Sequence, residues 1–182
     1  MRFREYFLKM RGTTRGGPPR VSHGEILWSW IGAFLGIAGV AWVNHLFFEG
    51  LDMSLMIGSF GASAVLVYGA VRSPLAQPRN LIGGHVLSAI VGVLCWKFMS
   101  QNLWFAESAA VATSIAVMHA TRTLHPPGGA TALIAVIGST EIHKMGFLYV
   151  LLPATIGPFI LLAVALLVNN IPASRRYPEI WF

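Results

Sequence analysis

Polar side chains that could bind an anion gather in two short stretches of an otherwise apolar chain. The first stretch contains two arginines and two amides, and the second contains an arginine, a threonine and two histidines. These residues are Arg72, Gln77, Arg79 and Asn80 in the first stretch, and His119, Arg122, Thr123 and His125 in the second. Arginine is always charged, and an imidazole can exchange a proton near neutral pH. The residue types therefore favour binding of a small anion, with a histidine available to carry a proton.

A Gly-Gly pair follows each polar stretch. The two copies read Gly83, Gly84, His85 and Pro126, Pro127, Gly128, Gly129. A helix that begins with proline and glycine leaves backbone N–H groups uncovered at its positive end, and such an end suits an anion. We therefore expect each Gly-Gly pair to head a helix, with His85 one residue inside its helix. The alternative is that the glycines only permit close helix packing.

The two stretches also align as an internal repeat. Residues 62–72 align without gaps on residues 112–122, and both runs close on an arginine. The copies are two segments apart, so they predict a parallel repeat about an axis along the membrane normal. In the second copy, His119 and Arg122 are three residues apart and are expected to share a helix face. In the first, Ser59 and Ser63 give the preceding segment a small, hydroxyl-bearing face that could line a path or contact a helix.

The elements that position these residues must be membrane helices. Only 11% of the residues are charged, where a soluble domain has about 25%. Hydrophobic residues make up 55% and the mean hydropathy is +0.64. We predict an all-α membrane protein with about six segments, a parallel repeat relating segments 2–3 to 4–5. The segments are Ile26–Phe48, Met53–Val71, Leu81–Trp96, Leu103–Thr121, Pro126–Thr140 and Met145–Ile171.

The fifth segment is shorter than a membrane crossing requires. A helix of its length would rise about 22 Å, and the hydrocarbon core is about 30 Å thick. We expect this helix to begin below the membrane surface, after a broken entry. Non-helical backbone is tolerated at that depth where it lines a cavity.

The basic residues predict the orientation. Six crossings place both termini on one side, together with 11 of the 13 Lys and Arg residues, and cytoplasmic segments are enriched in such residues. We expect a basic cytoplasmic arm at 1–24, one transmembrane domain at 25–171 and a short cytoplasmic tail at 172–182. The arm also resembles a transit peptide. The expected location is the bacterial inner membrane, or the plastid envelope in a eukaryote.

Several other functions fit the composition poorly. The basic residues form no surface stripe, so nucleic acid is not an expected partner. The single cysteine, Cys95, excludes an intramolecular disulfide and a zinc site built on several thiolates. A membrane metalloenzyme could use His85, His119 and His125, but no intramembrane carboxylate or H-E-x-x-H spacing accompanies them. We expect no enzymatic activity, no metal and no cofactor.

A scaffold or sensor subunit that transports nothing is the main alternative. Small residues form packing faces in several segments, including the G-x-x-x-G of Gly32 and Gly36. Such faces predict helix packing and self-association whatever the function. The expected partners are therefore a small inorganic anion, the lipid bilayer and further copies of the chain, with a dimer favoured.

The two motifs resemble the HPP family of integral membrane proteins. The run His-Pro-Pro-Gly-Gly-Ala-Thr-Ala-Leu at 125–133, with Arg122 before it, carries the resemblance. So does the run Ser-Pro-Leu-Ala-Gln-Pro-Arg-Asn at 73–80, which Gly-Gly-His follows at 83–85, and residues 58–66 agree with it. The resemblance covers about Met53 to Ser139. The family is usually described with four spans, against the six expected here.

The resemblance also implies a function. Members of the family in chloroplasts and cyanobacteria are implicated in nitrite transport. It therefore implies a transporter or channel for a small monovalent anion, with nitrite as its substrate. In the mechanism that we expect, the anion passes between the two Gly-Gly helix starts, and Arg72, Arg79 and Arg122 concentrate anions on the cytoplasmic side.

Overall fold

The computed structural model describes residues 3–10, 16–17, 19–48 and 57–182, and every regular element in these ranges is a helix. The α-helices are α1 (Phe3–Lys9), α2 (His23–Phe48), α3 (Ser59–Ala64), α4 (Pro78–Met99), α5 (Leu103–Ala120), α6 (Pro126–Ile137), α7 (Thr140–Met145), α8 (Leu148–Leu151) and α9 (Gly157–Val168). Two π-helical turns, η1 (Val65–Gly69) and η3 (Leu152–Ile156), continue α3 and α8, and η2 (Pro74–Ala76) is a 3₁₀ turn. The predicted all-α class is confirmed.

Within the described ranges, four helices are long and apolar enough to cross a membrane. They are α2, α4, α5 and the continuous helix over residues 148–168. Two shorter apolar helices, Ser59–Gly69 and α6, correspond to the second and fifth predicted segments. The start of the second segment, residues 53–56, lies outside the described residues. Helix α6 has 12 residues and rises about 18 Å, so it is short, as expected. The six full crossings and the internal repeat stay predictions.

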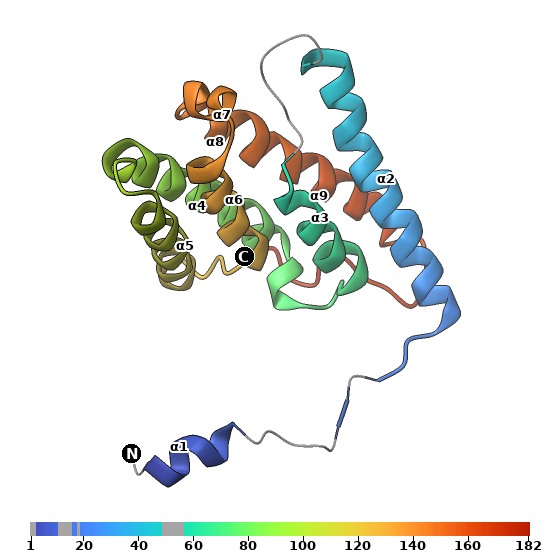
Figure 1. Cartoon of the computed structure of the whole chain (residues 1–182). Coiled ribbons are helices and arrows are strands. Elements are labelled where there is room, and N and C mark those ends of the chain that lie inside the picture. The colour runs from blue at the N-terminus through green and yellow to red at the C-terminus, as the bar shows by residue number, and fades with distance from the viewer. Residues whose placement is uncertain (1–2, 11–15, 18, 49–56) are drawn as a thin grey trace.

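Helix α4 lies at the centre of the bundle. It packs against α5 and α6 on one side and against α8, η3 and α9 on the other. Helix α2 runs beside α9 at the edge of the bundle away from α5 (Figure 1). The described polar stretches therefore meet near one end of α4, where the loop before it and the loop before α6 both arrive.

Helix α4 begins three residues earlier than predicted. Pro78 occupies its first turn after an extended Gln77, and proline is favoured there because it has no N–H to leave unpaired. Arg79 and Asn80 therefore lie in the first turn of the helix. Their side chains donate to carbonyl oxygens of the loop before α6. The predictions that Gly83 and Gly84 head this helix, and that His85 lies one residue inside, are wrong. Both glycines lie in its second turn.

The G-x-x-x-G of α2 is a packing groove, as predicted. A Cβ atom on Gly32 or Gly36 would overlap the ring of Tyr68, which is fully buried. The Tyr68 hydroxyl donates to the carbonyl oxygen of Leu161 at 2.9 Å. One side chain therefore fills the groove of α2 and ties it to α9.

The predicted tail is a packed part of the domain. The Tyr177 hydroxyl donates to the carbonyl oxygen of Ala76 at 2.8 Å, and the backbone N–H of Glu179 donates to Gln77 Oε1 at 2.9 Å. Burial raises the pKa of Tyr177 above its ordinary value, so the phenol keeps its proton and stays a donor. The tail thereby holds the loop before α4 in place.

Candidate functional site

One serine hydroxyl joins two buried histidines where α3, α4 and α6 meet. Ser63 Oγ lies 2.7 Å from His85 Nε2 and 2.9 Å from His125 Nε2. All three side chains are fully buried. The two imidazole rings lie 5.1 Å apart between centroids. Residues from three separate parts of the sequence therefore share one hydroxyl group.

Thr131 extends this cluster, and the sequence did not single it out. Its Oγ1 lies 2.7 Å from His85 Nδ1 and donates to Ser59 Oγ at 2.9 Å. The Tyr149 hydroxyl donates to the Thr131 carbonyl oxygen at 2.9 Å. The sequence pattern that could have identified Thr131 is a hydroxyl side chain one helical turn after Pro127 in an otherwise apolar helix. Ser59, Ser63, His85, His125 and Thr131 are called the histidine cluster below.

The histidine cluster is enclosed by apolar and aromatic side chains. Phe60 meets the His85 ring edge to face at 5.5 Å, and Phe60 is itself fully buried. Within the part of the chain that the structure describes, no three His, Cys, Asp or Glu side chains lie close enough to hold a metal ion. The arrangement can hold and pass protons, because each member is a hydroxyl or an imidazole.

Four predicted anion-binding residues line a hollow of about 230 Å³ next to this cluster. They are Gln77, Arg79, Asn80 and Arg122, and Pro74 and residues 180–182 complete the walls. Arg79 donates to the Thr121 carbonyl oxygen at 2.8 Å. Among the described residues, neither Arg79 nor Arg122 forms an ion pair. The lining of this hollow, called the arginine hollow below, therefore carries two arginine charges and no Asp or Glu side chain.

The arginine hollow and the histidine cluster share a wall. Asn80 Nδ2, at the hollow, donates to the carbonyl oxygen of Leu124 at 2.8 Å, and the next residue is His125. His125 Nδ1 lies 2.8 Å from the carbonyl oxygen of Leu75, which immediately follows Pro74 of the hollow. One layer of loop backbone separates the two groups.

The Gly-Gly pairs lie where α4 crosses α6 and the loop at 121–125. A Cβ atom on Gly83 would lie 2.6 Å from Thr123 Cγ2, and one on Gly84 would overlap His125 Cβ. A Cβ on Gly128 would lie 2.7 Å from the Gly84 carbonyl oxygen. Close packing therefore accounts for these three glycines, and it brings His85 and His125 together. Pro126 does begin α6, as predicted.

Replacing Gly128 by alanine should destabilise the fold. Its new Cβ would lie 2.8 Å from Ser88 Oγ and 3.0 Å from Met118 Sδ, so the helices must move apart. We expect Gly128→Ala to lower the free energy of unfolding by about 1–3 kcal/mol, measured by denaturant titration in detergent. Gly129→Ala is the matched control, because its Cβ would have Val111 at 3.8 Å as its nearest neighbour. Equal stability of the two variants would contradict this account of the crossing.

Two predicted site residues lie apart from both groups. His119 lies in an apolar groove on the outer side of α5 and α6 with Pro126 and Gly129, and its side chain is exposed. Helix α5 ends at Ala120, and Arg122 has a left-handed backbone with φ of 57°. His119 and Arg122 therefore do not share a helix face, and that prediction is wrong. The helix ends before Arg122, and the left-handed backbone of Arg122 turns the chain away from the helix axis.

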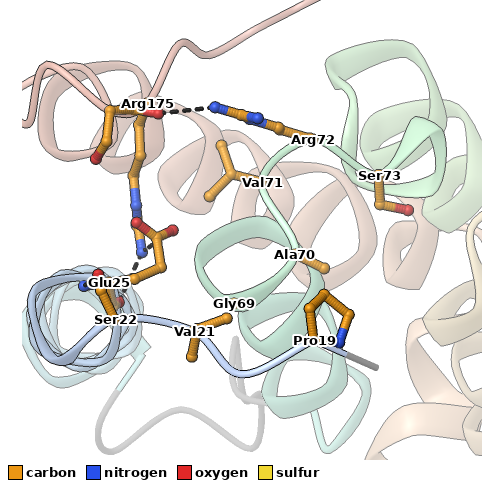
Figure 2. A pocket seen from close by; sticks show the side chains of 11 residues that line it. Pro19, Val21, Ser22, Glu25, Gly69, Ala70, Val71, Arg72, Ser73 and Arg175 are labelled. Atoms are coloured by element: carbon orange, nitrogen blue, oxygen red, sulfur yellow. Dashed lines mark hydrogen bonds and ion pairs between the residues drawn. The ribbon is translucent and has the colours of Figure 1, made fainter. Parts of the chain in front are cut away.

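Arg72 lines a different hollow, between the start of α2 and the tail (Figure 2). It donates to the Ser174 carbonyl oxygen at 3.0 Å and lies 3.9 Å from the Glu179 carboxylate. In the same hollow, Arg175 pairs with Glu25 at 2.8 Å (Figure 2). Arg72 thus contacts the tail and does not line the arginine hollow.

The chain matches the transmembrane region of the HPP family over residues 18–178. The match includes every residue of the histidine cluster and every residue of the arginine hollow except residues 180–182. The chain belongs to the HPP family. This HPP chain is therefore an integral membrane protein, as its four long apolar helices also indicate.

Two curated relatives are transmembrane proteins of Dictyostelium discoideum. One is 42% identical over 183 residues, which cover 99% of this HPP chain and 58% of the relative. The other is 45% identical over 184 residues, which cover 98% of this chain and 64% of the relative. The chain thus spans about three-fifths of the length of the curated relatives it matches. No solved structure matches it.

Proposed function

We propose that this HPP chain moves a small monovalent anion across the membrane, with nitrite as the substrate. The observation that carries the proposal is the arginine hollow, which brings Arg79 and Arg122 from the two polar stretches together in a lining that contains no Asp or Glu side chain. Two unneutralised cations at the mouth of a site raise the local anion concentration. The family resemblance supports nitrite as the anion.

The histidine cluster lies beyond the hollow on the proposed path. In the proposed orientation the hollow faces the cytoplasm, where most of the basic residues lie. The anion would pass from the arginines to the wall between Leu124 and Leu75 and then to the Ser63 hydroxyl. Hydroxyl and imidazole N–H groups can coordinate an anion once it has lost water. A weak site of this kind releases its ion on the other side.

Nitrite uptake into liposomes that contain the purified chain tests the proposal. We expect saturable uptake, with formate, nitrate and chloride as competitors that measure selectivity. Arg122→Asn should lower uptake by at least about tenfold, because it removes one of two charges that concentrate the anion. Asparagine tolerates the left-handed backbone at this position, so the change should leave folding intact.

The matched control for this experiment is Arg176→Asn. Arg176 is an exposed tail arginine that does not line the arginine hollow, so its loss should leave uptake unchanged. Equal losses in the two variants would show that the arginines act only through net charge. Absence of flux for every anion would refute transport and favour a scaffold or sensor subunit.

A further inference from the structure

The hydrogen bond between His125 and Leu75 determines which ring nitrogen of neutral His125 carries the proton. His125 Nδ1 lies 2.8 Å from the Leu75 carbonyl oxygen. A carbonyl oxygen only accepts hydrogen bonds, so Nδ1 must carry a proton. The other nitrogen, Nε2, faces Ser63 Oγ. It has a free lone pair when His125 is neutral and a proton when His125 is charged.

With both histidines neutral, the donors point one way along the histidine cluster. Ser63 must donate to His125 Nε2, so the Ser63 oxygen must accept from His85 Nε2. His85 then has no proton on Nδ1 and accepts one from the Thr131 hydroxyl. The Thr131 and Ser63 protons are therefore directed along the cluster toward His125, and not toward the Pro127 and Ser59 carbonyl oxygens that lie 3.2 Å from these hydroxyls.

With one more proton, every one of these hydrogen bonds reverses. A charged His125 donates from Nε2 to the Ser63 oxygen, and Ser63 donates to His85 Nε2. His85 then carries its proton on Nδ1 and donates to Thr131 Oγ1. The Thr131 hydroxyl is then free to donate to Ser59 Oγ at 2.9 Å or to the Pro127 carbonyl oxygen at 3.2 Å. Both arrangements satisfy the bridge between the histidines, and they differ by one proton.

We propose that the histidine cluster is a proton relay, in which a proton delivered to Thr131 Oγ1 becomes a positive charge on His125. The Thr131 proton moves to His85 Nδ1, the His85 Nε2 proton moves to Ser63 Oγ, and the Ser63 proton moves to His125 Nε2. Four protons on these side chains become five, and no bond between heavy atoms changes. The coupling of this proton to an anion rests on the proposed function; the relay itself rests on the hydrogen-bond geometry.

The surroundings of the cluster allow the added charge to attract an anion. No carboxylate of the described chain contacts the cluster, and η2, η3 and α9 contain no ionisable residue. Glu107 lies near the opposite end of α5, and His119 lies on its outer side. The ionisable groups of the other neighbouring elements are Tyr149 of α8, Tyr68 of η1, Arg79 of α4, Arg122 of the loop, and Tyr177, Arg175 and Glu179 of the tail, while Cys95 and Lys97 lie toward the far end of α4. The Glu179 carboxylate lies 3.9 Å from Arg72, and Arg175 pairs with Glu25. A charged His125 would add a third cation beside the arginine hollow.

Nitrogen-15 NMR of the full chain in lipid bilayers, with labelled histidine rings, tests the relay. As the pH falls, one histidine should change from a neutral ring protonated at Nδ1 to a doubly protonated ring. In the same pH interval a second histidine should stay neutral and move its proton from Nε2 to Nδ1. A purely structural pair would show no such exchange. Two histidines that keep their tautomers over the whole range in which the chain is folded would overturn the relay.

Ser63→Ala removes the bridging hydroxyl and should separate the two NMR transitions. Ser114→Ala is the control, because Ser114 on α5 is a buried hydroxyl with no hydrogen-bond partner in the described chain. It should leave the transitions coincident. Coincident transitions in folded Ser63→Ala would also overturn the relay, and the wild-type spectrum decides the matter if that variant does not fold.

Proton movement in liposomes with an internal pH dye tests the coupling. A nitrite gradient should carry about one proton per anion, and Ser63→Ala should lower this ratio at least tenfold while Ser114→Ala keeps it. Nitrite flux without proton movement in the wild type would overturn the coupling. Absence of any anion flux would instead overturn the proposed function, and the NMR experiment would still decide whether the relay exists.

Discussion

Arg175→Ala should strongly lower the free energy of unfolding of this protein, because Arg175 links the tail to α2 and η1. The Arg175 side chain is 2% exposed and lies 2.8 Å from the Glu25 carboxylate. The same guanidinium donates to Ser29 Oγ at 2.8 Å and to the Tyr68 carbonyl oxygen at 3.3 Å. Removing one partner of a fully buried ion pair costs about 3–5 kcal/mol. Because 29% of the Glu25 side chain is exposed, water can partly replace Arg175, and we expect a loss near the lower end of that range. Denaturant unfolding in detergent micelles measures this loss.

Part of that cost comes from the π-helical turn η1. A π turn leaves carbonyl oxygens without their usual helical partners, and here Asn169 donates to the Val67 carbonyl oxygen while Arg175 donates to that of Tyr68. Arg176→Ala is the matched control, because Arg176 is the exposed neighbour, and it should change stability by less than about 0.5 kcal/mol. A cost below about 1 kcal/mol for Arg175→Ala would contradict the assigned role, since that is the range of an exposed pair.

Tyr68→Ala should cost a similar amount for a different reason. The Tyr68 ring is fully buried and fills the groove at Gly32 and Gly36. Deleting a buried aromatic side chain leaves a cavity, and such changes cost about 3–5 kcal/mol. Lipid is as apolar as the bundle interior, so the loss comes mainly from packing contacts between helices. The free energy of unfolding in detergent measures it.

Two further variants separate the ring of Tyr68 from its hydroxyl. Tyr68→Phe keeps the ring and removes only the bond to the Leu161 carbonyl oxygen, so it should cost about 1 kcal/mol. Val65→Ala changes an exposed residue of the same turn, whose exposure is 69%, and should have little effect. If Tyr68→Phe were as damaging as Tyr68→Ala, the hydrogen bond and not the packing would hold α2 to the bundle.

The polar residues of the site were recognisable from the sequence, but their partners were not. Ser59, Ser63, His85 and His125 stood out because polar groups are rare within apolar segments. Helices that are apolar all round give no periodic signal of which face points inward. For that reason His119 and His85 looked equivalent, although one is exposed and the other is fully buried.

The ends of the helices were the least predictable local feature. The uncharged run at Leu81 suggested a later start for α4, because an arginine and an asparagine precede it. The helix nevertheless begins at Pro78, since both polar side chains find carbonyl acceptors on the loop before α6. Those acceptors come from more than 40 residues away in the sequence, and no local pattern could reveal them.

The sequence by itself determined the all-α membrane class, the membership of the HPP family and the two polar stretches, because composition and motifs need no partner to be read. Only the tertiary structure decided that Ser63 bridges His85 and His125, which lie 22 and 62 residues further along the chain. It also decided that Thr131 completes the cluster and that Arg79 and Arg122, but not Arg72, share a hollow. The physical reason is the close crossing at Gly84 and Gly128, where absent side chains let distant backbones touch.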